Sequence, residues 1–123
     1  MAYTSNNVFA KILKGEIPFK KFYEDDMVLC FPDLQPLAAV HLLIIPKNPY
    51  SSFDDFSSNA SDQEISSFFR AIKTIARKAG VDQTGYRLIA NHGLHAHQEV
   101  PHFHFHLLGG QSLGGMMGSV QKG

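Results

Sequence analysis

A stretch near the C-terminus alternates histidine with apolar residues, and it restricts the possible folds more than any other part of the chain. Within residues 100–110 the histidines are His102, His104 and His106, and each is followed by a phenylalanine or a leucine. A period of two is the period of a β-strand, in which successive side chains point to opposite faces of the sheet. The pattern therefore predicts a strand with three imidazoles in one row, spaced about 6.5–7 Å apart, and with the intervening apolar side chains in the core.

Three interpretations of this histidine row are open on the residues alone. The row could be the polar outer face of a strand that happens to use histidine. It could be a metal site, because neutral imidazole suits zinc, copper and nickel. It could also support covalent catalysis, in which one neutral imidazole attacks an electrophile while its neighbours set its tautomer and move protons.

Several other motifs accompany the histidine row in a definite order. Residues 102–108 follow the pattern His-φ-His-φ-His-φ-φ, where φ is apolar. Upstream stand VFAKILKGEIP at residues 8–18, YEDD at 23–26, FPDLQP at 31–36 and HLLIIPK at 41–47. On these motifs, over about residues 8–110, the chain resembles the histidine triad (HIT) superfamily and in particular its Hint branch, the histidine triad nucleotide-binding proteins.

The resemblance implies an α+β chain with a HIT-like fold. We expect a single HIT domain over residues 1–123, with a core of about 6–110 and a glycine-rich tail at 111–123. A chain of this length is normally one domain and can bury a core without metal or disulfide. The resemblance implies an antiparallel sheet of about five strands, one short and one long helix, and a homodimer in which the sheet continues across the two subunits.

Local patterns predict the individual elements. Asn6 or Asn7 can cap a short helix that ends at Leu13 or Lys14, after a loose leader at residues 1–5. The sequence Ser-Asp-Gln-Glu at 61–64 is a capping box that opens a long helix to Ala79. Its apolar stripe comprises Ile65, Phe68, Phe69, Ile72, Ile75, Ala76 and Ala79. Strands are predicted at 20–24, 27–32, 40–45 and 86–91, with a surface connection at 47–60.

The resemblance assigns roles to four histidines. His104 matches the nucleophile, and the main-chain carbonyl of His102 would accept from its other ring nitrogen. His106 would donate to the phosphoryl oxygens. His41, with the side chain of His102, would form a supporting proton network. We expect the remaining loop histidines, His92, His95 and His97, to be surface residues.

The resemblance also implies a nucleotide pocket. Asp33 matches an aspartate that binds the ribose hydroxyls, which suits a carboxylate because it offers two acceptor oxygens. The apolar slot for the nucleobase would include Val8, Phe9, Ile12 and Leu34. Contacts with the phosphate and the leaving group would come from Asn91, Gln98 and Glu99.

Two positions depart from the family pattern. Pro49 stands where another histidine is common, so a role of that histidine is absent from this chain. Glu99 stands where many Hint-type relatives carry a hydroxyl residue. A carboxylate repels a nearby phosphate unless it is protonated or turned away. Glu99 therefore bears on which leaving group is assisted.

Composition and charge exclude several classes of protein. The formal net charge is zero, so we expect no binding to nucleic acid. No apolar run approaches the roughly 20 residues that a membrane-spanning helix needs, and no signal peptide is visible, so we expect a cytoplasmic protein without a membrane partner. The lone Cys30 fits a reducing compartment and lies in an apolar run as a small buried side chain.

The resemblance to the Hint branch implies a purine nucleoside phosphoramidase that binds purine nucleoside monophosphates or phosphoramidates and needs no cofactor. One alternative is a dinucleoside polyphosphate hydrolase. Another is a nucleotide-binding regulatory protein with residual activity only. We expect no metal, and Asn7 and Ala10 stand where some relatives carry a zinc-binding cysteine pair.

Overall fold

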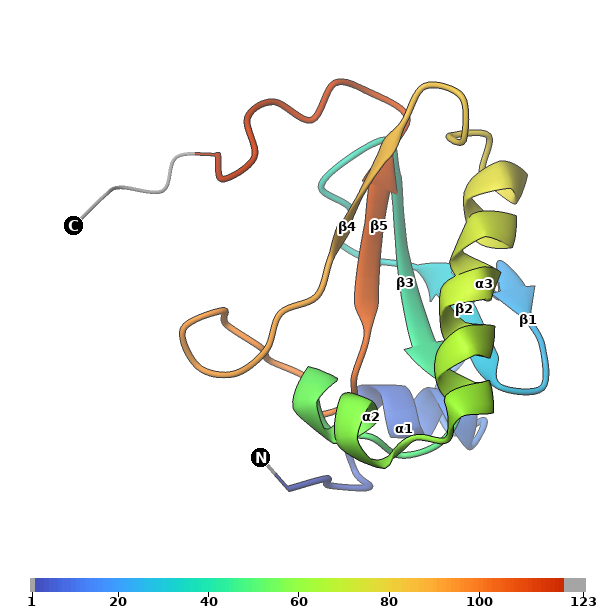
Figure 1. The fold of residues 1–123 in the computed structure, drawn as a ribbon, viewed down its shortest axis with the longest axis vertical. Helices are drawn as coiled ribbons and strands as arrows, with labels where there is room; N and C mark the ends of the chain where they lie inside the picture. The colour runs from blue at the N-terminus through green and yellow to red at the C-terminus, as the bar shows by residue number, and fades with distance from the viewer. Residues whose placement is uncertain (1, 119–123) are drawn as a thin grey trace.

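The computed structural model describes residues 2–118, and this part of the chain contains five strands and three helices (Figure 1). The presence of both helices and an antiparallel sheet confirms the predicted α+β class. Residues 111–118 of the glycine-rich tail form no helix or strand, and the rest of the tail lies outside the described residues. The elements are α1 (Val8–Leu13), β1 (Tyr23–Glu24), β2 (Val28–Pro32), β3 (Val40–Pro46), α2 (Phe53–Asn59), α3 (Asp62–Lys78), β4 (Tyr86–Ile89) and β5 (Phe105–Gly109).

The strands form one antiparallel sheet in the order β1-β2-β3-β5-β4. Strand β3 lies at the centre and pairs with β2 on one side and β5 on the other. Leu43 of β3 lies opposite His106 of β5, and His41 lies opposite Leu108. Residues opposite each other in a ladder point to the same face, so this register places His41 and His106 side by side.

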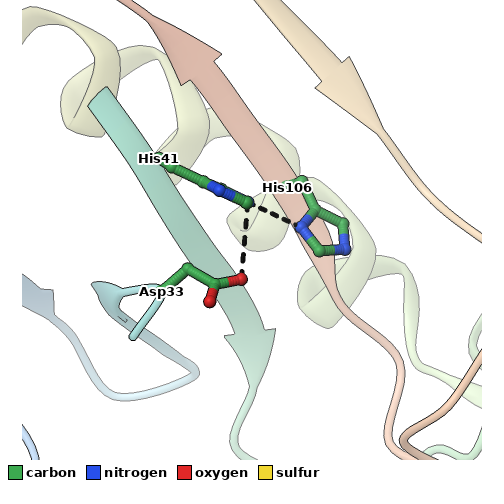
Figure 2. A group of neighbouring side chains, drawn as sticks. All are labelled: Asp33, His41 and His106. Atoms are coloured by element: carbon green, nitrogen blue, oxygen red, sulfur yellow. Dashed lines mark hydrogen bonds and ion pairs between the residues drawn. The ribbon is translucent and has the colours of Figure 1, made fainter. Parts of the chain in front are cut away.

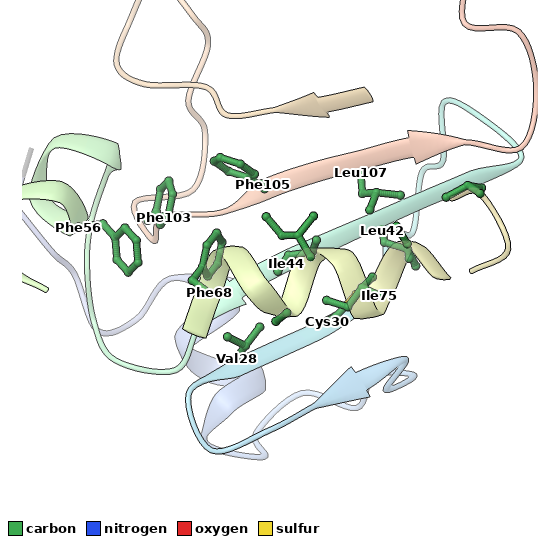
Figure 3. Close-up of a cluster of buried hydrophobic side chains, with 14 residues drawn as sticks. Val28, Cys30, Leu42, Ile44, Phe56, Phe68, Ile75, Phe103, Phe105 and Leu107 are labelled. Carbon is green, nitrogen blue, oxygen red and sulfur yellow. The ribbon is translucent and has the colours of Figure 1, made fainter. Parts of the chain in front are cut away.

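One face of the sheet, which we call the α3 face, carries the larger part of the core (Figure 3). Helix α3 lies along this face and packs against alternate residues of three strands. Burial of such apolar side chains contributes about 25 cal/mol per Å² removed from water. The strand residues of the α3 face are Val28, Cys30, Leu42, Ile44, Phe105 and Leu107.

Local sequence signals account for α3. The Ser61 hydroxyl accepts from the Glu64 main-chain N–H while the Glu64 carboxylate accepts from that of Ser61, which confirms the capping box. Phe68 and Ile75 of the predicted stripe are fully buried, whereas Phe69 is 45% exposed at its margin. No helix in the described residues has the length and apolarity that crossing a membrane requires.

The opposite face, which we call the histidine face, carries a smaller apolar cluster together with imidazoles. Alternate strand residues point this way, including Leu43 and Ile45 of β3, and they pack against Phe9 and Ile12 of α1. Asn7 caps α1 as predicted, because its side chain accepts from the Ala10 main-chain N–H. Helix α1 thus packs on the histidine face, next to the imidazoles.

Several predicted boundaries are wrong. The connection at 47–60 contains helix α2, capped by the Ser52 side chain and anchored by the buried Phe56. Strand β1 has two residues instead of five, and β4 ends at Ile89. The histidine strand begins at Phe105, because the ladder with β3 ends at the pair Ile44 and Phe105. Of the three histidines, His106 alone belongs to β5.

Candidate active site

His41 and His106 form the centre of a polar cluster on the histidine face (Figure 2). The Nε2 atom of His41 lies 2.9 Å from Nδ1 of His106. Asp33, in the loop after β2, places a carboxylate oxygen 3.5 Å from the same His41 atom. The loop is held there because the Asp33 main-chain N–H donates to the His41 carbonyl at 3.0 Å.

Main-chain contacts determine which nitrogen of each ring carries the proton. The Leu37 N–H donates to Nδ1 of His41 at 3.1 Å, so that nitrogen is the acceptor and Nε2 carries the hydrogen. The His41 Nε2–H then donates to Nδ1 of His106. A neutral imidazole has one donor and one acceptor, so the remaining proton of neutral His106 is on Nε2.

His104 precedes β5 and is oriented by a main-chain carbonyl. Its Nδ1 lies 2.8 Å from the carbonyl oxygen of His102, which can only accept, so Nδ1 carries the hydrogen and Nε2 keeps a lone pair. The ring packs edge-on against Phe9 at 5.0 Å and His106 at 5.1 Å between centroids. This is the tautomer that a nucleophilic Nε2 requires.

Burial keeps the histidines neutral. It lowers the pKa of His106 to about 4, and the neighbouring imidazoles of His104 and His41 act in the same direction. Burial also lowers the pKa of His104 and of His41, although the Asp33 carboxylate opposes the shift in both. Neutral rings at neutral pH can act as nucleophile and as hydrogen-bond donors.

The side chain of His102 does not join this cluster, which corrects the predicted single row and the predicted network with His41. Its ring is fully buried, with Nε2 2.8 Å from the Pro46 carbonyl and Nδ1 2.8 Å from the Tyr3 hydroxyl. The chain at 101–104 lies outside the sheet ladder, so strand alternation does not govern it.

A cavity of about 370 Å³ opens over His104 and His106. Its lining includes two carboxylate residues and, among the described residues, no lysine or arginine. The predicted residues Asn91, Gln98 and Glu99 all line it, and so does His97, which the prediction assigned to the loop surface. The lining residues are Phe9, Asp33, Leu43, Asn91, His97, Gln98, Glu99, Val100, His104 and His106.

Gln98 reaches the cavity but its amide is occupied by main-chain atoms. Its Nε2 donates to the carbonyls of Ser51 and Val100, and its Oε1 accepts from the Gly93 N–H. Both amide hydrogens are therefore engaged. Gln98 thus connects the loop that precedes His102 to Ser51, which precedes α2. No local sequence pattern predicts this role.

A second, apolar cavity of about 320 Å³ lies beside the first. The four residues predicted for the nucleobase slot, Val8, Phe9, Ile12 and Leu34, all line it. Phe19, 38% exposed, also lines it and was not predicted. Phe9, Asp33 and Leu43 line both cavities, so the apolar slot and the polar cavity adjoin at these residues.

The donor atoms of Asp33, His41 and His106 lie within 4.8 Å of one another. One carboxylate and two imidazoles are a donor set that zinc accepts. The His41 and His106 nitrogens are hydrogen-bonded to each other, and the Asp33 oxygen lies 3.5 Å from His41 Nε2. The expectation of a metal-free site stays a prediction.

Comparison with known proteins gives a consistent result. A 13.2 kDa HIT-like protein of Azospirillum brasilense is 50% identical over 115 residues, covering 94% of each chain. The purine nucleoside phosphoramidase of Escherichia coli is 41% identical over 110 residues, covering 89% of this chain and 92% of its own. A histidine triad protein of Clostridium difficile has 42% identity and a TM-score of 0.82, covering 94% of this chain and 99% of its own.

The family match covers most of the chain. The HIT domain matches residues 14–113, a range that includes His41, His102, His104 and His106. With the fold and the similar proteins in agreement, this chain belongs to the HIT domain family.

Proposed function

We propose that this protein hydrolyses purine nucleoside 5′-phosphoramidates through a covalent nucleotidyl intermediate on His104. The observation that carries the proposal is the hydrogen bond from His104 Nδ1–H to the His102 carbonyl. It leaves the Nε2 lone pair unprotonated on a ring that lines the polar cavity. The name of the 41% identical relative, a purine nucleoside phosphoramidase, supports the same reaction.

In the first step, His104 Nε2 attacks the α-phosphorus and forms a phosphorus–nitrogen bond. The bond to the leaving amine breaks with its electron pair, and the amine takes up a proton from solvent. In the second step, water attacks the phosphorus and the bond from phosphorus to His104 Nε2 breaks, which releases the nucleoside monophosphate, one proton and the neutral imidazole. Two displacements replace one difficult displacement, which is the advantage of a covalent intermediate. No metal takes part.

His106 supplies the donor for the phosphoryl oxygens. The His41 Nε2–H donates to His106 Nδ1, which keeps the His106 proton on Nε2. Charge on the phosphoryl oxygens is stabilised by donors that are already oriented in a site with little water. His41 is thus a positioning residue, and Asp33 beside it favours the proton at His41 Nε2.

The purine base would bind in the apolar slot. Phe9 and Ile12 offer apolar surface to a flat ring, and Asp33 lies where the slot meets the catalytic cavity. A nucleoside with its base in the slot would therefore bring its ribose hydroxyls to the Asp33 carboxylate and its α-phosphate to His104. Leu34, almost fully exposed here, would be covered by the bound base.

Charge favours this substrate over a dinucleoside polyphosphate. The lining of the catalytic cavity includes Asp33 and Glu99, and no lysine or arginine among the described residues. A polyphosphate brings several negative charges toward these carboxylates, whereas a phosphoramidate carries one and releases an amine. Measured side by side, kcat/KM should be higher for an adenosine phosphoramidate than for a diadenosine polyphosphate.

The protein is further proposed to act as a cytoplasmic homodimer. Strand β4 is an edge of the sheet, and its Tyr86 and Leu88 are each more than one-third exposed. An unpaired strand edge with apolar side chains can extend its sheet with a second copy. The buried thiol of Cys30, whose pKa burial raises to about 12, suits a reducing compartment.

Mass spectrometry of the protein mixed with a slowly hydrolysed adenosine phosphoramidate tests the proposal. We expect a nucleotidyl adduct on the peptide that contains His104, and none in the matched variant His104→Ala. Turnover without any adduct on a histidine would refute the covalent mechanism. Binding of nucleotide without turnover would favour the regulatory alternative.

A further inference from the structure

The N-terminal segment contacts His102, the buried first histidine of the His-φ-His-φ-His motif. The Tyr3 hydroxyl lies 2.8 Å from Nδ1 of His102, and the two rings meet edge to face with centroids 5.5 Å apart. His102 itself is fully buried. A residue expected in a loose leader is therefore in direct contact with a histidine of the motif.

The direction of this hydrogen bond follows from the other side of the ring. His102 Nε2 lies 2.8 Å from the Pro46 carbonyl, which can only accept, so the ring hydrogen is on Nε2. Nδ1 is then an acceptor, and the Tyr3 hydroxyl donates to it. Both nitrogens of a buried imidazole are satisfied, one by β3 and one by the N-terminal segment.

The main chain of His102 matters because its carbonyl orients His104. This carbonyl accepts from His104 Nδ1–H at 2.8 Å. Residues 101–104 are outside the sheet ladder, which begins at Phe105. The position of the carbonyl therefore depends on nearby anchors, which are the two hydrogen bonds of the His102 ring and the Phe103 N–H bond to the Tyr50 carbonyl at 2.7 Å.

The segment that carries Tyr3 is tied to the start of α1. The Asn7 side-chain amide donates to the Thr4 carbonyl at 2.7 Å, and the Asn7 main-chain N–H donates to the same oxygen at 3.2 Å. The Lys14 ammonium donates to the Ser5 carbonyl at 3.1 Å. These bonds connect Tyr3 to the N-cap of the helix that also supplies Phe9 to the site.

We propose that Tyr3 is a positioning residue for the nucleophile: its hydroxyl anchors the His102 ring, and the His102 carbonyl in turn orients His104. The inference rests on the proposed function in taking His104 as the nucleophile. Removing the hydroxyl leaves a buried ring nitrogen without its donor, and loss of one such hydrogen bond corresponds to about a tenfold effect on an equilibrium or a rate.

The kinetic test compares Tyr3→Phe with Tyr23→Phe. Both variants lose one tyrosine hydroxyl that donates at 2.8–2.9 Å. The partner of Tyr23 is Asp25 in the β1–β2 turn, and two strands of the sheet lie between β1 and β5. With an adenosine phosphoramidate we expect Tyr3→Phe to lower kcat about tenfold and to leave KM nearly unchanged. Tyr23→Phe should match wild type. A wild-type kcat in Tyr3→Phe, or a change confined to KM, would overturn the proposal.

A second measurement does not depend on turnover. Nitrogen-15 NMR of the imidazole rings reports which nitrogen of His104 is protonated. We expect one tautomer, with hydrogen on Nδ1, in wild type and Tyr23→Phe, and a mixture of tautomers or exchange broadening in Tyr3→Phe. Unchanged His104 signals would overturn the positioning role. If wild type proved inactive on phosphoramidates, the proposed function would fail, and these signals alone would decide the role of Tyr3.

Discussion

The two faces of the sheet are built from alternate residues of the same strands, yet they depend on different physics. On the α3 face, Ile44 and Leu107 pack with Phe68 and Ile75 into a continuous apolar layer. On the histidine face, the neighbouring positions include His41 and His106, and a ring nitrogen of one meets a ring nitrogen of the other.

The difference is that apolar packing on the α3 face has no required direction, whereas the hydrogen bonds on the histidine face do. Apolar burial is non-directional and roughly proportional to area, so the α3 face tolerates small shifts. The imidazoles, in contrast, need particular partner atoms, and some of these lie in distant parts of the chain. The bonded pairs Tyr3 with His102 and His41 with His106 are 99 and 65 positions apart. Substitutions on the α3 face should therefore reduce stability, and those on the histidine face should reduce rate.

The largest expected effect on the histidine face is that of His104→Ala. Phosphoramidase turnover should fall by at least about a thousandfold, because the nucleophile is removed. Nucleoside monophosphate binding should change much less than turnover. His95→Ala, in an exposed loop, is the control. Near-normal turnover of His104→Ala would remove the nucleophile assignment and with it the contrast between the faces.

On the α3 face, Phe68→Ala should lower the free energy of unfolding by about 3–5 kcal/mol. The Phe68 ring is fully buried and contacts Phe56, Phe103 and Phe105, so its removal leaves a cavity. Phe69→Ala, a substitution of the neighbouring half-exposed ring, should have a clearly smaller effect. Denaturant unfolding of the two variants measures both, and equal losses would contradict the packing described here.

Acid should lower the free energy of unfolding through the histidines, because the side chains of the α3 face are apolar. Burial lowers the pKa of His102 and of His106 to about 4, against an ordinary value of 6.5. The unfolded chain therefore takes up protons first, so this stability is complete above about pH 6.5 and is lost as the pH falls toward about 4. At about pH 5 the loss should be about 1–2 kcal/mol for the fully buried His102 ring and smaller for His106, because solvent reaches that ring and screens its charge. Thermal unfolding from about pH 7 to about pH 5 measures it, and a flat profile would contradict burial of these rings as neutral groups.

The contrast between the faces also explains what the sequence could predict. The capping box of α3, the Asn7 cap of α1 and the apolar runs that became β2 and β3 are local signals, and the structure contains the elements they predict. The apolar slot residues also line one cavity, as the resemblance implied. Helix α2 was missed although Ser52 and Asp55 form a local cap, because a polar stretch hid the single buried Phe56.

The misplaced features all depend on contacts between distant segments. Alternation placed His102 in the row with His104, but the ladder ends at Phe105 and the His102 ring instead bonds to Pro46 and Tyr3. Gln98 lines the polar cavity, but the sequence did not predict that its amide binds main-chain atoms of Ser51 and Val100. No pattern within one segment can report a hydrogen bond whose other half lies some fifty or a hundred residues away.

The smallest effect expected is that of Asp33→Ala, and it tests whether the carboxylate recognises ribose. Nucleoside monophosphate affinity should fall about tenfold, since hydrogen bonds to a charged group contribute about 1.5–3 kcal/mol. The matching 2′-deoxynucleotide should lose less, because it offers one hydroxyl fewer. Binding is the right measurement, because Asp33 also lies beside His41 and its loss would alter turnover by another route. Asp26→Ala, in an exposed turn, is the control, and equal losses for both nucleotides would leave Asp33 as a partner of His41 alone.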